Sequence, residues 1–342
     1  MMVVWRIFFA IALPAAAQSW TPVASGTSAN LRGVSAKGQV VWVSGDKGTV
    51  LRTIDNGSTW GAVSPRGVAD LDFRDIEAVD DSTAFLLSSG QGPQSRIYKT
   101  TDGGGTWALL ATNLEPKGFW DCMSFWDPTH GIIVGDPPTG GDGRFTIMTT
   151  IDGATWQKIK GPPANKDEGA FAASGTCVFT RGTREAWFGT GGVGGGRVFH
   201  SGDGGQSWSI AKTPIRHDSA SAGIFSLAFS DSQHGVAVGG DYMKPAESVG
   251  TIGITSDGGK TWTSGTLPGY RSSVTYVGVD VWFCTGAGGS DWSVDEGKTW
   301  MPWATGGFNA FSYGWAVGPS GQIARWDLTG LGLATSLPPA PR

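Results

Sequence analysis

One short pattern recurs six times along this chain and constrains its fold more than any other feature. Five copies fit Ser/Thr-x-Asp-x-Gly-x-x-Trp, and the third, residues 150–156, is one residue shorter. Because the copies recur every few tens of residues, the chain must repeat one structural unit along its length. The Asp and Trp of the six copies are Asp55 and Trp60, Asp102 and Trp107, Asp152 and Trp156, Asp203 and Trp208, Asp257 and Trp262, and Asp295 and Trp300.

Each copy lies between two strand-like runs, so it is typical of a tight turn in a β-hairpin. Around the first copy, residues 48–53 precede the turn and residues 60–63 follow it. Gly57 can adopt the positive φ that such a turn needs. Asp55 can accept hydrogen bonds from backbone N–H groups of its own turn, and Trp60 offers a large apolar surface for packing. We therefore predict a structural role, and no catalytic one, for the twelve Asp and Trp residues.

A second apolar run lies upstream of each copy, and it occurs seven times. A further strand-like run precedes each of these, so that one unit has strands A, B and C, the Asp turn, and then strand D. Four short strands per unit are typical of a propeller blade. The seven runs that we assign to strand B are residues 41–45, 84–87, 131–135, 186–189, 235–239, 281–284 and 314–318.

The seventh unit has no Asp turn and no strand D, and the missing strand is found at the other end of the chain. Residues 19–23, Ser-Trp-Thr-Pro-Val, resemble the start of a strand D. Pairing this strand into the last unit closes the ring and removes open sheet edges. The sequence therefore predicts an all-β, seven-bladed β-propeller of four-stranded blades over residues 18–328, with its last blade closed by the N-terminal strand.

The two ends of the chain differ from the repeats. Arg6, the apolar run 7–13 and the small residues 15–17 predict a signal peptide over residues 1–17. The apolar run is too short for a lasting membrane anchor. We expect an exported protein, periplasmic or secreted, with no stable membrane insertion after the signal is cleaved. Residues 329–342 are predicted to be a disordered tail.

Composition excludes several classes of function. The 342 residues carry a net charge of −4 and give a pI of about 5.6, which predicts no nucleic-acid partner. Cys122, Cys177 and Cys284 are far apart in the sequence and form no ligand motif. We expect three small buried hydrophobic side chains and no disulfide framework. The four His are scattered, so no metal site is predicted, and no cofactor motif with its proper context occurs.

The repeated turn resembles the Asp box, also called the bacterial neuraminidase repeat. Over residues 19–328 the chain is similar to the photosystem II stability/assembly factor family, and within it to the bacterial, non-photosynthetic branch. The resemblance implies a seven-bladed propeller that binds another protein. Photosynthetic members hold their client on a basic surface, and the acidic balance of this chain departs from that pattern. The segments that carry the resemblance are residues 119–126, 134–137, 169–175, 221–226, 239–242 and 269–272.

Candidate binding residues lie in the connections on the face away from the Asp turns. There the B–C and D–A connections include loops that are longer than a turn requires, and such loops often carry function. We expect their polar side chains to converge around the central channel and to bind a ligand or partner. The candidates are Asp121, Asp136, Glu168, Asp241, Tyr242 and Arg271.

The favoured function is a protein-binding or assembly module without catalytic activity, and two alternatives stay open. A carbohydrate-active enzyme of the sialidase or glycoside-hydrolase propeller type needs paired carboxylates, for which Asp136 and Asp241 are the candidates. The Arg-Ile-Pro motif of sialidases is absent from the sequence, and we assign no catalytic residue. The third possibility is a plain small-ligand binder.

Overall fold

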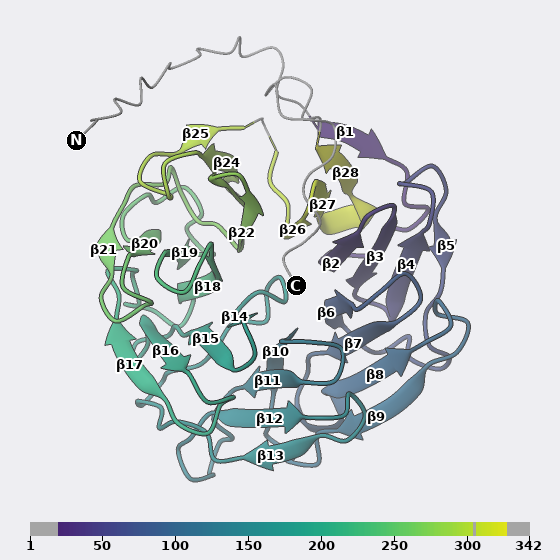
Figure 1. Ribbon diagram of the computed structural model, residues 1–342, viewed down its shortest axis with the longest axis horizontal. Coiled ribbons are helices and arrows are strands. Elements are labelled where there is room, and N and C mark those ends of the chain that lie inside the picture. The colour runs from purple at the N-terminus through teal and green to yellow at the C-terminus, as the bar shows by residue number, and fades with distance from the viewer. Residues whose placement is uncertain (1–19, 304–305, 327–342) are drawn as a thin grey trace, which may run out of the picture.

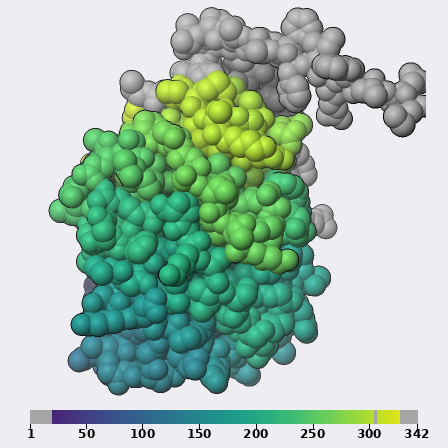
Figure 2. Space-filling view, turned by 90° about the vertical axis from the view of Figure 1, so that its left-hand side faces the viewer, coloured from purple at the N-terminus to yellow at the C-terminus, as the bar shows by residue number. Residues whose placement is uncertain are grey.

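Seven four-stranded antiparallel sheets are arranged in a ring, with their first strands toward its centre (Figure 1). The computed structural model describes residues 20–303 and 306–326. The predicted signal peptide and the predicted tail lie outside these residues. The fold is a seven-bladed β-propeller, as the sequence predicts. Figure 2 views the ring from its rim, where the teal and green blades pack side by side.

The strands follow the A–D order of the sequence analysis. In blade 1 these are β2 (Leu31–Lys37), β3 (Val40–Gly45), β4 (Thr49–Thr53) and β5 (Gly61–Ala62); in blade 2, β6 (Phe73–Ala78), β7 (Ala84–Ser88), β8 (Arg96–Thr100) and β9 (Ala108–Thr112); in blade 3, β10 (Trp120–Phe125), β11 (Gly131–Gly135), β12 (Thr146–Thr150) and β13 (Gln157–Ile159). In blade 4 they are β14 (Val178–Arg181), β15 (Glu185–Gly189), β16 (Arg197–Ser201) and β17 (Ser209–Lys212); in blade 5, β18 (Ala222–Phe229), β19 (Gly235–Asp241), β20 (Ile252–Thr255) and β21 (Thr263–Ser264); in blade 6, β22 (Ser273–Gly278), β23 (Val281–Gly286), β24 (Gly289–Ser293) and β25 (Met301–Pro302). Blade 7 consists of β26 (Ala310–Ser312), β27 (Trp315–Val317), β28 (Ile323–Trp326) and β1 (Trp20–Val23).

The helical content of the described chain is limited to two short 3-10 turns, η2 (Gly92–Gln94) and η3 (Pro319–Gly321). No helix in residues 20–303 and 306–326 is long and apolar enough to cross a membrane.

The N-terminal strand closes the ring. Strand β1 pairs with β28 in antiparallel register, from Trp20 opposite Trp326 to Val23 opposite Ile323. In Figure 1 the purple β1 lies beside the yellow β28. The Trp20 ring packs edge-on against Phe308, with 4.8 Å between centroids, and against Phe283 at 5.6 Å. The prediction of closure by the N-terminal strand is confirmed.

Burial changes from the channel to the rim of each blade. Strand B is covered on both faces by neighbouring blades, so β3 and β19 are buried at every residue, and most of their residues are apolar or glycine. The outermost strands β5, β21 and β25 are exposed and two residues long. Such short outer strands offer little edge for another chain to pair with.

The Asp turns are held by the same hydrogen bonds in copy after copy. In the first, Thr53 Oγ1 donates to Asp55 Oδ1 (2.7 Å) and accepts from Gly57 N (3.0 Å). Asp55 Oδ1 also accepts from Thr59 N at 2.8 Å. The Trp ring after each of the first two turns packs against a neighbouring blade. The ring centroids of Trp60 and Trp315 are 5.7 Å apart, and those of Trp107 and Trp42 are 6.0 Å apart. These contacts are the ones that a structural role of the Asp turns requires.

The expectation for the cysteines is wrong for two of the three. Cys122 and Cys177 form a disulfide with 6.0 Å between their Cα atoms, although 55 residues separate them. Cys122 is on β10 and Cys177 directly precedes β14, and these are the inner strands of neighbouring blades. The packing of neighbouring blades therefore brings these two cysteines together, although they are distant in the sequence. Cys284 is free and buried, as predicted.

Candidate functional site

The direction of the strands gives the ring two different faces. In each blade the chain turns from strand A to strand B, and from strand C to strand D, on the same face of the ring. We call this the box face, because it carries the Asp turns. The B–C and D–A connections lie on the opposite face, which we call the loop face. All six residues predicted from the sequence to bind a ligand or partner come from the loop-face ends of strands or from the connections there.

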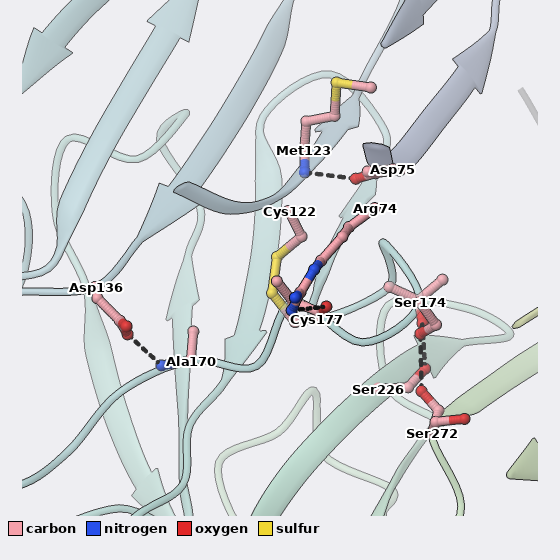
Figure 3. The surroundings of a disulfide bond; sticks show 12 residues. Arg74, Asp75, Cys122, Met123, Asp136, Ala170, Ser174, Cys177, Ser226 and Ser272 are labelled. Atoms are coloured by element: carbon pink, nitrogen blue, oxygen red, sulfur yellow. Dashed lines mark hydrogen bonds between the residues drawn. A yellow bond between two sulfur atoms is a disulfide. The ribbon is translucent and has the colours of Figure 1, made fainter. Parts of the chain in front are cut away.

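A segment from the loop face crosses the channel, and we call residues 169–177 the plug. Arg74 Nη1 of blade 2 donates to Ala172 O at 3.1 Å. Ser174 Oγ donates to Ser272 O, next to blade 6, at 2.7 Å. Blades 2 and 6 are each two blades away from blade 4, so these two contacts span the ring. Figure 3 shows the plug held between these groups and the disulfide to Cys122.

Asp121 and Asp136 are the two predicted site residues that the structure brings together. Asp136 Oδ1 accepts a hydrogen bond from Ala170 N of the plug at 2.8 Å (Figure 3), and burial raises the pKa of Asp136 to about 6. Asp121 is 1% exposed, and within the described chain its Oδ2 has no hydrogen-bond partner. Burial and the nearby Asp136 raise the pKa of Asp121 well above its usual range, and Arg74 opposes this. Of the two carboxylates, Asp136 is the one that holds the plug.

Glu168 and Arg271 are each held in a separate buried ion pair. The Glu168 carboxylate accepts from Arg197 Nε at 2.8 Å and from Thr190 Oγ1 at 2.6 Å. Arg271 is 1% exposed and donates from Nε to Asp291 Oδ2 at 2.7 Å. These charges are matched inside the protein and are not directed at an external ligand.

Asp241 ends β19 and Tyr242 begins the B–C loop of blade 5, and the two residues differ in accessibility. Asp241 is 2% exposed and accepts from Met243 N at 3.0 Å, so it orders its own loop. Tyr242 is 48% exposed, and its ring lies edge-on to Phe225 at 6.1 Å. Phe225 in turn stacks on Phe171 of the plug at 4.0 Å. The six residues therefore do not form one cluster, and only Tyr242 among them is exposed.

The loop face of blades 4 and 5 carries exposed apolar side chains that the sequence analysis missed. Val193 belongs to the B–C loop of blade 4, and Met243 and Val249 belong to that of blade 5; they are 58%, 69% and 79% exposed. We call these three residues and Tyr242, which lie on the B–C loops of two adjacent blades, the apolar loop patch. Arg216 lies beside the blade 5 loop, where it is ion-paired with Asp218 and Glu247.

On the box-face side of the plug, the channel holds a cavity of about 230 Å³. Its wall comes from the inner strands of all seven blades, and Ser174–Thr176 of the plug form part of its lining. Four charged residues line it: Lys37, Asp75, Glu77 and Arg181. Sequence analysis placed the candidates on the loop face and did not find this cavity. The sequence signal that could have indicated the cavity is the pair Asp75 and Glu77. These carboxylates are two residues apart, and alternate residues of a strand lie on the same side of it.

Side chains of the inner strands bridge every joint of the ring along the channel. At six joints of the described structure the bridging group is a Ser or Thr hydroxyl, and at the joint of blades 2 and 3 it is the Asp75 carboxylate. The bridges join Ser35 to Ala78, Asp75 to Met123, Ser124 to Thr180, Thr176 to Ser226, Ser226 to Val274, Thr275 to Phe311 and Ser312 to Ala36.

The carboxylates of the cavity are held in an unfavourable environment for a negative charge. Burial and the neighbouring Glu77 raise the pKa of Asp75 well above its usual range. Burial also raises the pKa of Glu77, against the opposing charge of Lys37. Perturbed carboxylates in a cavity are candidates for a functional role.

Comparisons with known proteins support the fold at low sequence identity. The structure is similar to that of YCF48 bound to D1 peptide, with a TM-score of 0.62 and 16% identity over 90% of this chain and 96% of that one. It is equally similar to YCF48 from Cyanidioschyzon merolae, with a TM-score of 0.62 and 16% identity over 91% and 99% of the two chains. A GH74 xyloglucanase from Xanthomonas campestris gives a TM-score of 0.46 at 13% identity, over 82% of this chain and 52% of that one. No family model matches the sequence, and no curated protein matches it.

Proposed function

We propose that this chain is an exported protein-binding module that holds an extended segment of a client protein on its loop face. The apolar loop patch carries the proposal. Val193, Tyr242, Met243 and Val249 expose apolar surface on neighbouring loops, and exposed apolar groups that lie together are typical of interaction sites. Tyr242 is supported from below by Phe225 and the plug, so its ring is an ordered anchor of the kind that dominates interfaces.

The structural neighbours support this class of function by analogy of fold. One of them is described as YCF48 bound to D1 peptide, which is a protein partner. The proposal places this chain with the Asp-box propellers of the assembly-factor type, in their bacterial branch, and places its action after export to the periplasm or the medium. Its client is distinct from that of the photosynthetic members, because the net charge of −4 does not provide a broadly basic surface.

Binding is favoured over glycoside hydrolysis by the state of the two carboxylates that an enzyme would use. Asp136 accepts from Ala170 N and Asp241 accepts from Met243 N, and each interaction holds a different loop. A hydrolase needs one carboxyl group as acid and another as base or nucleophile beside the same glycosidic bond. Here each carboxylate has a local structural partner instead.

Peptide binding by matched variants tests the proposal. The full chain is applied to an array of overlapping peptides from exported proteins of the same cell, and hits are measured in solution by fluorescence anisotropy. Tyr242→Ala and Met243→Ser should each weaken a true hit by about tenfold or more, as expected for anchor residues. Ile151→Ser is the control, because Ile151 is 77% exposed on the box face. Equal loss in the control, or no hit at all, would contradict the proposal.

A parallel assay separates binding from catalysis. Sialosides and common β-glycans are incubated with the wild type, Asp136→Asn and Asp241→Asn. We expect no turnover by any of the three proteins. Turnover by the wild type that either substitution abolishes would replace the binding module by a carbohydrate-active enzyme.

A further inference from the structure

We propose that the channel cavity binds a small organic cation with a protonated amine, and that Asp75 is the group that holds the ammonium. This site lies on the box-face side of the plug and is separate from the apolar loop patch. It therefore goes beyond the proposed function and does not depend on it. Asp75 is the one carboxylate among the bridging groups of the described chain, and it lines the cavity.

Asp75 has a close structural counterpart in Ser226, and the comparison shows that a charge is not needed for bridging. Both residues directly follow a shift in register between strands A and B of their blades. Asp75 Oδ2 accepts from Met123 N at 2.8 Å, and Ser226 Oγ accepts from Val274 N at 2.9 Å. A hydroxyl thus makes the same bridge without the large desolvation cost of a buried carboxylate. The carboxylate of Asp75 therefore indicates a second role besides bridging the blades.

The position of Asp75 in the wall of the cavity indicates that this second role is to bind a ligand there. Asp75 is 5% exposed and lines the cavity, and its Oδ2 accepts a hydrogen bond from Met123 N. Figure 3 shows this bond beside the disulfide and the plug. Gly175 of the plug lies against the other oxygen: a Cβ built at Gly175 would lie 2.4 Å from Asp75 Oδ1. Asp75 is therefore at the end of the cavity that the plug closes.

The charges around Asp75 favour a cation as the ligand. Glu77 raises the pKa of Asp75, and no positively charged group is among the influences that lower it. Lys37 on β2 faces Glu77 and lowers its pKa, so the one lysine compensates one of two carboxylates. Arg181 on β14 also lines the cavity, with Tyr276 on β22 and Tyr313 on β26. Neither Lys37 nor Arg181 is among the groups that lower the pKa of Asp75, and an ammonium group beside Asp75 would supply the opposite charge there.

The walls and size of the cavity define the rest of the ligand. Four aromatic residues, Phe125, Phe179, Tyr276 and Tyr313, are among those that line it, and aromatic rings attract organic cations. Its volume of about 230 Å³ is below the roughly 300–1,000 Å³ of sites for drug-sized ligands. A short alkylamine or amino alcohol fits these limits, and a peptide chain does not.

Burial and Glu77 raise the pKa of Asp75, and an ammonium group paired with the carboxylate would lower that pKa again. Binding should therefore be accompanied by release to solvent of any proton that Asp75 holds in the empty site. Affinity should therefore rise with pH until the ligand's own amine loses its proton. Glu77, Lys37, Arg181, Tyr276 and Tyr313 are the other titratable groups of the cavity, and the pH profile of Asp75→Asn identifies the contribution of Asp75.

Calorimetric titration of the full-length protein provides the test. The probes are ethylamine and ethanolamine, with propanol as a neutral control and propionate as an anionic one. We expect one site for the amines, proton release on binding, and no binding of propanol or propionate. Binding of propionate alone, or of no amine at millimolar concentration, would overturn the proposal and would leave the peptide assay of the loop face unaffected.

Two substitutions separate the ligand role of Asp75 from its bridging role. Asp75→Ser copies Ser226 and should keep or raise the melting temperature, while amine affinity falls by about tenfold or more, as for loss of a charge-assisted hydrogen bond. Asp75→Asn keeps an acceptor for Met123 N and should lose the amine in the same way, which covers the case in which Asp75→Ser does not fold. Glu296→Gln on an exposed Asp turn is the control. Unchanged affinity in a folded Asp75 variant would refute the assignment.

Discussion

Cys177, the last residue of the plug, is joined by a disulfide to Cys122 on the inner strand of the preceding blade. The bond links two blades and fixes the end of a segment that also contacts Arg74 of blade 2 and Ser272 beside blade 6. One covalent bond thus holds the element that separates the loop face from the cavity. Such a bond is compatible with the export that we propose, because disulfides persist in oxidising compartments.

The first prediction is that loss of this disulfide destabilises the propeller and loosens the plug. For the sequence separation of 55 residues, chain entropy predicts a loss of about 4 kcal/mol in the free energy of unfolding. Guanidinium denaturation of Cys122→Ser with Cys177→Ser measures it. Hydrogen exchange should also rise at residues 169–177. Cys284→Ala is the control, since its buried thiol is free and its loss should leave exchange in the plug unchanged.

The second prediction concerns closure of the ring by β1. Deletion of residues 18–25 removes the partner of β28 and the Trp20 ring that packs on Phe308 and Phe283. We expect a large fall in melting temperature, because an unpaired edge and apolar side chains become exposed. Removal of residues 329–342 is the comparison and should have little effect. Equal melting temperatures of the two truncated proteins would refute the closing role of β1.

The sequence predicts this architecture well because its signals are local and repeated. Each Asp turn is specified within eight residues, as the bonds of Thr53, Asp55 and Gly57 show. Trp20 could be assigned to blade 7 because that blade alone lacked a strand D. The count of blades then follows from counting the repeats.

The candidate site could be predicted only in part, because it depends on contacts between distant segments. Arg271 forms its ion pair with Asp291, which lies 20 residues further along the chain on β24. Nothing in the sequence near Arg271 identifies this partner. Ala172 crosses the channel to reach Arg74, and a loop that returns over the ring has no sequence signature. The cavity around Asp75 is likewise made by seven separate strands.

The third prediction concerns an Asp turn. Trp107 packs on Trp42 and donates from Nε1 to Val63 O at 2.7 Å, so Trp107→Ala should cost about 3 kcal/mol or more of stability. Asp102→Ala should also destabilise, because Thr106 N and Thr100 Oγ1 lose their acceptor. Urea denaturation measures both. Peptide and amine affinities of the folded variants should match those of the wild type, and a binding defect at full stability would contradict a structural role.

The fourth prediction is a pH dependence caused by Asp136. Burial raises its folded pKa to about 6 from a usual value of 3.8, so the folded state favours the protonated form. Its contribution to stability is full below pH 3.8 and declines as pH rises from there through about 6. Asp136→Asn should remove this decline and still accept from Ala170 N. Chemical denaturation between pH 4 and 7.5 tests it, and parallel curves for the two proteins would contradict the assignment.

At low pH, the free energy of unfolding should depend on the carboxylates of the Asp turns. Hydrogen bonds from the backbone and side chain of Thr106 lower the pKa of Asp102 to about 2. This stabilising contribution is present above pH 3.8 and is lost as pH falls through about 2. Stability of the wild type should therefore fall steeply below pH 4, and the fall should be shallower in Asp102→Asn. A wild-type protein that is as stable at pH 2 as at pH 4 would argue against these lowered values.

The last prediction concerns Arg271, one of the candidate binding residues predicted from the sequence. Arg271 is 1% exposed, and its guanidinium is paired with Asp291, whose side chain is 2% exposed. Arg271→Glu would bury two carboxylates together, and Arg271→Met would leave Asp291 without a partner. Breaking a buried pair from one side costs about 3–5 kcal/mol, whereas replacing both members with apolar residues is often neutral. We expect Arg271→Met to lower the melting temperature strongly and Arg271→Met with Asp291→Leu to recover most of it. Differential scanning calorimetry of the two single variants and the double variant measures the coupling. Additive losses in the double variant would show that Arg271 acts through groups other than Asp291.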